Sequence, residues 1–197
     1  MQCRNSPHWL EESQIIFVKT NEMRKLKIQM NILLDNKWDS GMSDFSIDNL
    51  INVDCILHGR KTGEGFIPYW TEVANNPSDG EHKLGRRFAE IPNAIFSNTL
   101  KDSKWDNTTI INGDLAEVIK ALKNKDGKNI IVYGGDSFVS SLIQHDLIDE
   151  YYVLANPAAL GNGQQTFNPL KNELELKLVE CKPFACGAVL VYYSRQC

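Results

Sequence analysis

The stretch NIIVYGGDSFVSSLI, residues 129–143, constrains the fold more than any other part of the chain. Residues 129–133 form a continuous β-branched apolar run, which is typical of a strand covered on both faces. After two glycines the apolar residues recur at helical spacing, and Asp136 stands where an N-cap residue belongs. We therefore expect one buried strand, a tight glycine turn and one helix.

The glycine pair, Gly134 and Gly135, favours an anion at this turn. The free N–H groups of the first helical turn and the positive end of the helix dipole point beyond the sheet. A tight turn between strand and helix also occurs in proteins that bind nothing there. This stretch alone leaves both interpretations open.

Strand-like and helix-like patterns alternate along most of the chain. The clearest helix begins at Asp114, which forms a capping box with Glu117, and we expect it to end at Gly127. This alternation is typical of a parallel sheet. The other strands expected in the parallel part lie at 25–34, 53–57, 92–96 and 108–112.

The C-terminal third has a different pattern. DEYYVLANP, ELELKLVE and GAVLVYY follow one another with no convincing helix between the last two. We read them as antiparallel strands added to a parallel core. The predicted fold class is α/β, with a mostly parallel central sheet, antiparallel C-terminal strands and helices on both faces.

The length of 197 residues suits one large α/β domain, which we place at 23–197. Residues 1–22 are expected to be a mobile N-terminal extension. A hydrophobic fraction of 42%, a charged fraction of 23% and a net charge of −4 describe an ordinary globular protein without a basic field for nucleic acid. Nucleic-acid binding is therefore disfavoured, and the partner that we expect is a small-molecule substrate.

Cysteine and histidine usage argues against disulfides and metals. The five cysteines form an odd set without a CxxC pair, which favours a reduced, cytoplasmic protein. The four histidines are scattered, so we predict no metal site. No apolar run approaches the ~18 residues of a membrane helix. Leu174, Leu176 and Leu178 share one face of an apolar C-terminal sheet region, which predicts a homodimer.

Two further junctions resemble the first. Gly59 follows a strand, and Arg60, Lys61 and Thr62 open a helix with two cations and a hydroxyl, which suit phosphate. The alternative is a solvated basic turn. The turn Ser97-Asn98-Thr99 is uninformative alone. Because the carboxyl ends of parallel strands share one edge of a sheet, the three junctions together predict a ligand with separated phosphates.

The order GRKT, SNTL, YGGDSF, LIDEYYVLANPAALGNGQQTF and two closing strands resembles the dihydrofolate reductase-like fold. It is most similar to stand-alone proteins related to the C-terminal reductase domain of the bifunctional riboflavin-biosynthesis deaminase-reductase. The resemblance implies that NADPH, with NADH as a possibility, lies with its pyrophosphate on the glycine pair and its adenosine phosphates on the other two junctions. The implied cofactor residues are Gly59, Arg60, Lys61, Thr62, Ser97, Thr99, Gly134, Gly135, Asp136, Ser137 and Phe138.

Hydride transfer also needs a proton source and a substrate surface. Asp35, at the carboxyl end of the first strand, is the best candidate acid, and its alternative role is to form a turn. Tyr69 and Trp70 suit stacking on a flat heterocycle or, alternatively, core packing. Glu150 is a weaker substrate candidate with the same choice.

The resemblance implies an NAD(P)H-dependent reductase of a pteridine- or pyrimidine-like heterocycle or a related C=N or C=O acceptor. Such an enzyme is similar to 5-amino-6-(5-phosphoribosylamino)uracil reductase. Departures from the family pattern, such as Asn36 where relatives carry glycine and Asn98 where they often carry a basic residue, keep alternatives open. These are a true dihydrofolate reductase and a nucleotide-binding protein with little catalysis.

Overall fold

The computed structural model describes residues 23–32, 38–134, 136–158, 167, 170 and 173–196. The N-terminal extension predicted at 1–22 and the residues Asp35 and Gly135 lie outside this part of the chain. Within it, no helix is both long enough and apolar enough to cross a bilayer.

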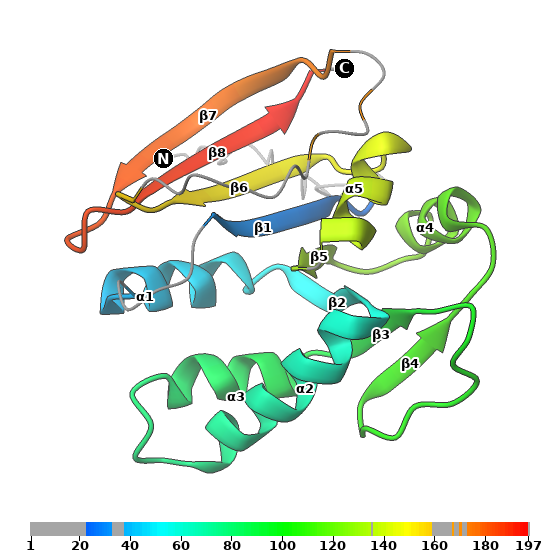
Figure 1. Ribbon diagram of the computed structural model, residues 1–197, viewed down its shortest axis with the longest axis horizontal. Coiled ribbons are helices and arrows are strands. Elements are labelled where there is room, and N and C mark those ends of the chain that lie inside the picture. The colour runs from blue at the N-terminus through cyan, green and yellow to red at the C-terminus, as the bar shows by residue number, and fades with distance from the viewer. Residues whose placement is uncertain are drawn as a thin grey trace, which may run out of the picture.

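The strands form one eight-stranded sheet in the order β4-β3-β2-β5-β1-β6-β8-β7, from green to orange in Figure 1. β1 to β6 pair in parallel, and β8 is antiparallel to both β6 and β7. The predicted α/β fold class, with antiparallel strands closing a parallel sheet, is therefore confirmed. The strands are β1 (Leu26–Ile32), β2 (Val53–Gly59), β3 (Asn93–Phe96), β4 (Thr108–Ile111), β5 (Asn129–Tyr133), β6 (Glu150–Ala155), β7 (Leu176–Pro183) and β8 (Val189–Arg195).

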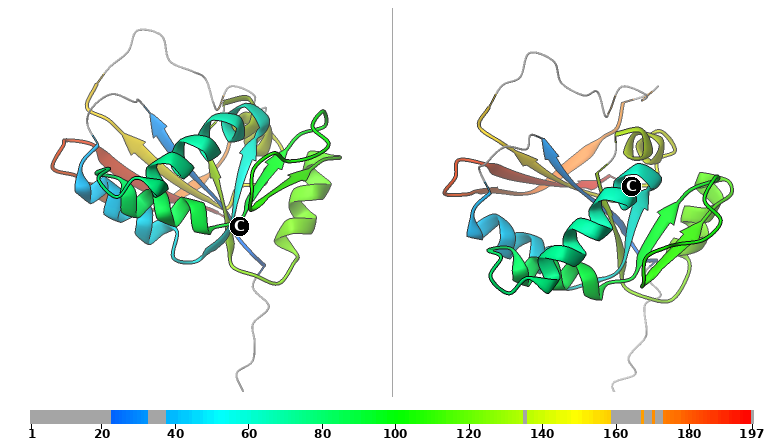
Figure 2. Two further views of the ribbon diagram at one scale, coloured as in Figure 1. Left: turned by 90° about the horizontal axis from the view of Figure 1, so that it is seen from below. Right: turned by 60° about the horizontal axis from the view of Figure 1, so that its bottom comes forward.

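Helices cover both faces of this sheet, as expected (Figure 2). They are α1 (Ser40–Asn49), α2 (Arg60–Asn75), α3 (His82–Glu90), α4 (Leu115–Lys123) and α5 (Asp136–Gln144). The alternation of side chains along β5 shows how the core divides. Ile130 and Val132 pack with apolar residues of α4 and α5, whereas Ile131 and Tyr133 pack with those of α2 and α3. β5 is therefore buried on both faces, which explains its uninterrupted apolar sequence.

Two predicted helix ends need correction. α4 begins as expected, because the Asp114 carboxylate accepts a hydrogen bond from the N–H of Glu117 at 3.0 Å, but it ends at Lys123 and is capped by Asn124 rather than Gly127. Gly127 lies in the following turn with φ of 153°. α5 begins at Asp136 itself, one residue earlier than an N-cap role for Asp136 requires.

α1 is one of two helices, with α3, that the sequence patterns did not predict. Its inward-facing residues include the buried polar side chains Ser46 and Asn49. Asn49 accepts two hydrogen bonds from the buried Lys27 ammonium, through its backbone oxygen at 2.9 Å and its side-chain oxygen at 3.0 Å. Gln29 donates to Ser46 and accepts from Asn49. Polar contacts thus hold α1 to β1, so the helix lacks the apolar stripe by which amphipathic helices are recognised.

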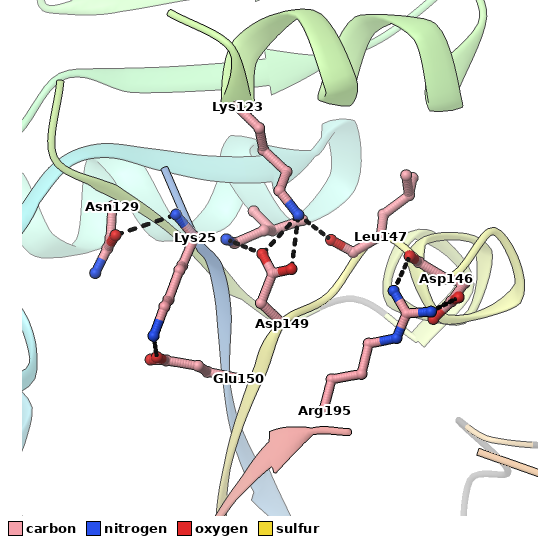
Figure 3. A network of polar contacts seen from close by, with 9 residues as sticks. Lys25, Lys123, Asn129, Asp146, Leu147, Asp149, Glu150 and Arg195 are labelled. Atoms are coloured by element: carbon pink, nitrogen blue, oxygen red, sulfur yellow. Dashed lines mark hydrogen bonds and ion pairs between the residues drawn. The ribbon is translucent and has the colours of Figure 1, made fainter. Parts of the chain in front are cut away.

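A network of ion pairs and hydrogen bonds fixes the amino ends of β1 and β6 (Figure 3). The Asp149 carboxylate accepts from the backbone N–H of Leu26 at 2.7 Å and pairs with Lys123 of α4 at 2.6 Å. The backbone oxygen of Asp149 also accepts from the N–H of Arg195 in β8. One residue therefore joins β1, α4 and β8 at the edge of the sheet opposite the glycine pair.

Candidate functional site

The three predicted junctions meet at the carboxyl edge of the parallel strands. β2 lies between β3 and β5, and its last residue, Gly59, pairs with Phe96 at the end of β3. α2 begins directly after Gly59, and α5 begins two residues after Gly134. Two helix N-termini and the turn after β3 therefore lie side by side, which concentrates backbone N–H donors and positive helix ends at one place.

The backbone conformation and the surroundings of Gly134 both favour glycine over any residue with a side chain. Its φ is 63°, in the left-handed region that residues with a Cβ rarely adopt. A Cβ at Gly134 would also lie 3.1 Å from Cγ2 of Thr62 in α2. The turn after β5 is therefore in close contact with the first turn of α2.

Gly59 makes the matching contact with α5. A Cβ at Gly59 would lie 2.7 Å from Cβ and 3.0 Å from Cγ of Phe138, closer than real Cβ atoms approach one another. The Phe138 ring stacks on Phe96, with ring centroids 5.8 Å apart and planes 22° apart. Phe138 thus packs α5 onto the ends of β2 and β3.

Arg60 connects the second junction to the third. Its Nη1 donates to Thr99 Oγ1 at 3.0 Å, and its Nε donates to Glu64 Oε1 at 3.0 Å. The hydroxyl of the buried Ser97 accepts from the backbone N–H groups of Thr99 and Leu100, at 3.2 and 3.1 Å, and so shapes the turn. An exposed guanidinium is consequently held at the N-terminus of α2, where it suits an anionic ligand.

Asn98 in the same turn has a structural contact. Its Oδ1 accepts from the backbone N–H of Gly113 at 3.0 Å, which ties the turn after β3 to the turn after β4. Lys61 and Ser137 lie exposed near the starts of α2 and α5. The described residues predicted to bind the cofactor therefore gather at one edge of the sheet.

His58, next to Gly59 in β2, lies beneath this edge. Its ring is completely buried, its Nε2 lies 3.0 Å from Asn93 Oδ1, and it packs on Phe66 with centroids 4.6 Å apart. Burial lowers the pKa of His58 to about 4. The imidazole is therefore neutral at physiological pH, and it is part of the buried layer beneath the site.

The sequence profile of the family described as the RibD C-terminal domain matches residues 35–190. The chain belongs to the RibD C-terminal domain family. Two Bacillus subtilis (strain 168) proteins are similar along most of their length. "Uncharacterized protein YyaP" is 33% identical over 156 residues, 79% of each chain, and "Uncharacterized protein YwjB" is 28% identical over 161 residues, 82% of each.

Solved structures show that this RibD C-terminal domain shares its fold with a putative riboflavin biosynthesis protein, a uracil reductase and a dihydrofolate reductase. A putative riboflavin biosynthesis protein from Shewanella sp. PV-4 aligns with a TM-score of 0.62 at 18% identity, over 88% of this chain and 99% of that one. The Thermotoga maritima deaminase/5-amino-6-(5-phosphoribosylamino)uracil reductase also gives 0.62, at 14% identity, over 90% and 58%. Enterococcus faecalis dihydrofolate reductase gives 0.57 at 14% identity, over 87% and 96%.

Two predicted substrate residues of this RibD C-terminal domain lie away from the three junctions. Trp70 is ten residues beyond Arg60 in α2, about 15 Å along the helix. Its ring packs on Phe88 and Tyr69, with centroids 4.6 and 5.1 Å apart. The alternative of core packing accounts for the contacts of Trp70, whereas the Tyr69 side chain is 57% exposed.

Glu150, the weaker substrate candidate, lies far from the three junctions. Glu150 is the first residue of β6, a strand parallel to β1, so it lies at the amino edge, opposite the glycine pair. Its buried carboxylate pairs with Lys25 at 2.9 Å and accepts from the Tyr152 hydroxyl at 3.0 Å. Glu150 therefore neutralises a cation and closes a hydrogen bond at the far end of the sheet.

Sequence reasoning missed Glu64 and Phe96 at this site. Glu64 follows Arg60 by four residues, the spacing at which side chains on a helix pair, so the sequence carried a readable signal. Phe96 gave no such signal, because the last apolar residue of a strand is ordinarily a core residue. A cavity of about 520 Å³ lies elsewhere, between the end of α5 and the end of β8, lined by residues such as His145, Asp146 and Arg195.

Proposed function

We propose that this RibD C-terminal domain is an NADPH-dependent reductase of a pteridine- or pyrimidine-like heterocycle or a related C=N or C=O acceptor. The observation that carries the proposal is the convergence of two helix N-termini, with Arg60 hydrogen-bonded to Thr99 between two strand ends. Helix N-termini bind phosphates through free N–H groups, and a guanidinium adds charge-assisted hydrogen bonds. A dinucleotide carries phosphates at several points and suits this arrangement.

The residues present fit such a cofactor. Gly134 is exposed and has no side chain, so a phosphate can approach its backbone. Arg60 and Lys61 supply positive charge, and the hydroxyl of Thr99 lies beside the guanidinium. We assign the pyrophosphate to the N-terminus of α5 and the adenosine phosphates to the region of Arg60, Lys61, Ser97 and Thr99. When bound, the cofactor would supply a hydride to the acceptor.

Asp35 stays the candidate proton donor, and the nearest described carboxylate does not offer an alternative. Asp39, the nearest described carboxylate in sequence, accepts hydrogen bonds from the N–H groups of Met42 and Cys186, both at 2.9 Å. These bonds, led by that from Cys186, lower the pKa of Asp39, so its carboxylate stays ionised and caps α1. Asp35 lies outside the described residues and stays a candidate from the sequence alone.

The acceptor class draws support from the named structural neighbours. One is the Thermotoga maritima deaminase/5-amino-6-(5-phosphoribosylamino)uracil reductase, and another is a pyrimidine reductase-like protein from Corynebacterium diphtheriae with a TM-score of 0.56. The Enterococcus faecalis dihydrofolate reductase was solved with NADP(H). A true dihydrofolate reductase and a nucleotide-binding protein with little catalysis are the competing functions.

One assay separates the three functions. The decrease in NADPH absorbance is followed with dihydrofolate and, separately, with 5-amino-6-(5-phosphoribosylamino)uracil or a related pyrimidine. We expect NADPH binding together with oxidation by a pyrimidine-type acceptor. Turnover with dihydrofolate alone would instead establish a dihydrofolate reductase, and binding without turnover of any acceptor would favour the non-catalytic alternative.

A further inference from the structure

The first turns of α2 and α5 are connected by two reciprocal contacts. Thr62, the third residue of α2, packs on Gly134 after β5, and Phe138, the third residue of α5, packs on Gly59 at the end of β2. β2 and β5 are neighbours in the sheet. Each helix therefore contacts the glycine at the end of the strand that leads into the other helix.

The atoms in contact show what these two contacts fix. At Gly59 the nearest atom is Cβ of Phe138, which is bonded to the backbone and does not move with side-chain rotation. At Gly134 the Thr62 methyl, Cγ2, lies 3.1 Å from the position of a Cβ, and the hydroxyl, Oγ1, lies 3.8 Å from it. The contacts therefore restrain the helix backbones, and the methyl of Thr62 is the closer group.

We propose that Thr62 and Phe138 are positioning residues that set the separation between the N-termini of α2 and α5, so that one dinucleotide reaches both. The inference rests on the proposed function and adds a role to it. A ligand that bridges two rigid anion sites binds tightly only when their separation matches its own phosphates, because misplacement loses one set of contacts. In this role the Thr62 methyl matters as much as its hydroxyl.

The test uses two substitutions that change the same contact from opposite sides. Gly134→Ala adds a Cβ against the Thr62 methyl, and Thr62→Ser removes that methyl while keeping the hydroxyl. We expect Thr62→Ser alone to raise the Kd for NADPH by about threefold and Gly134→Ala to raise it by about tenfold or more. In the Gly134→Ala protein, Thr62→Ser should instead lower the Kd by about threefold, because the space for the new Cβ returns.

A matched control separates packing from hydrogen bonding. Thr62→Val keeps a methyl against Gly134 and removes the hydroxyl, so it should give no recovery in the Gly134→Ala protein. The positioning role is overturned if Thr62→Ser weakens NADPH binding in both backgrounds, or if Thr62→Val restores binding as well as Thr62→Ser does. Circular dichroism spectra confirm that each variant is folded.

The outcome for the wild type separates this inference from the proposed function. If the wild type binds NADPH but Thr62→Ser does not lower the Kd in the Gly134→Ala protein, the proposed function stands and the positioning role is refuted. A wild-type protein that does not bind NADPH refutes both. The melting temperatures of the same variants then report only whether residue 62 contacts residue 134 as described.

Discussion

Arg60 donates a hydrogen bond from Nη1 to the hydroxyl of Thr99 at 3.0 Å, which joins the start of α2 to the turn after β3. The two residues are 39 positions apart in the chain, and their contact brings a cation to the shared edge of two neighbouring strands. The cofactor proposal depends on this relationship, because a phosphate near Thr99 lies within reach of the same guanidinium.

Arg60→Ala should weaken NADPH binding by about tenfold, which corresponds to about 1.4 kcal/mol. NADH should be affected less, and the wild type should prefer NADPH over NADH by about 1–2 kcal/mol. Isothermal titration with both cofactors measures these differences. Arg86→Ala, which removes an exposed arginine that pairs with Glu90 on α3, is the control and should leave both affinities unchanged. Equal affinities of the wild type for the two cofactors contradict the assignment of Arg60.

Gly59→Ala should destabilise the protein by about 1–3 kcal/mol, because the added Cβ meets Cβ of Phe138 at 2.7 Å. The matched control is Gly65→Ala in α2, the helix that follows Gly59, where a Cβ would meet nothing within 4 Å. That substitution should stabilise the helix by about 0.5–1 kcal/mol. Urea unfolding gives both values, and a Gly59→Ala protein as stable as the wild type would show that the contact with Phe138 is looser than described.

Asp149→Ala should cost about 1–3 kcal/mol of stability, because it leaves the N–H of Leu26 and the Lys123 ammonium without their shared carboxylate. Asp146→Ala, which breaks the exposed pair with Arg195, should cost less than about 1 kcal/mol. Thermal melts of the two variants compare a junction of three elements with a surface ion pair. Equal losses from the two substitutions would argue against the anchoring role of Asp149.

Acid should destabilise the fold through His58. Its pKa is about 4 in the folded protein and about 6.5 when unfolded, so the unfolded chain binds the proton more readily. This contribution is complete above pH 6.5 and is lost as the pH falls towards 4, to an extent on the order of 3 kcal/mol. We expect the free energy of unfolding, measured by urea titrations between pH 4 and 7, to depend less steeply on pH for His58→Gln than for the wild type. Parallel pH profiles of the two proteins contradict this account.

The C-terminal edge of the sheet leads us to expect a homodimer. Leu174 and Leu176 pack partly against the core, but Leu178 and Val179 of the edge strand β7 are 54% and 52% exposed. Light scattering at micromolar concentration should give a dimer mass for the wild type and a monomer mass for Leu178→Glu. Ile51→Glu alters an equally exposed residue after α1 and should leave the dimer intact. A monomeric wild type contradicts the expectation.

The sequence allowed the parallel sheet to be predicted where apolar patterns coincide with burial. The run at 129–133 is buried on both faces, and Gly134 after it has a positive φ, so pattern and structure agree. α1 was missed because Ser46 and Asn49 face inward and meet Lys27 and Gln29, a partnership between segments that no local periodicity reveals.

Chain order explains why the predicted cofactor residues lie together. Residues that follow β2, β3 and β5 must lie at the carboxyl edge, and the structure brings them together. The same rule applied to Glu150 assigns it to the amino edge, because it is the first residue of its strand. Trp70 required knowledge of how α2 packs on α3, where Phe88 receives its ring, and that depends on contacts distant in sequence.

A crystal of the protein soaked with NADPH tests the central claim most directly. The account predicts phosphate density between the N-termini of α2 and α5, with a cofactor phosphate within hydrogen-bond distance of Arg60. Density only in the cavity near His145 and Arg195, or none at saturating NADPH, would contradict it.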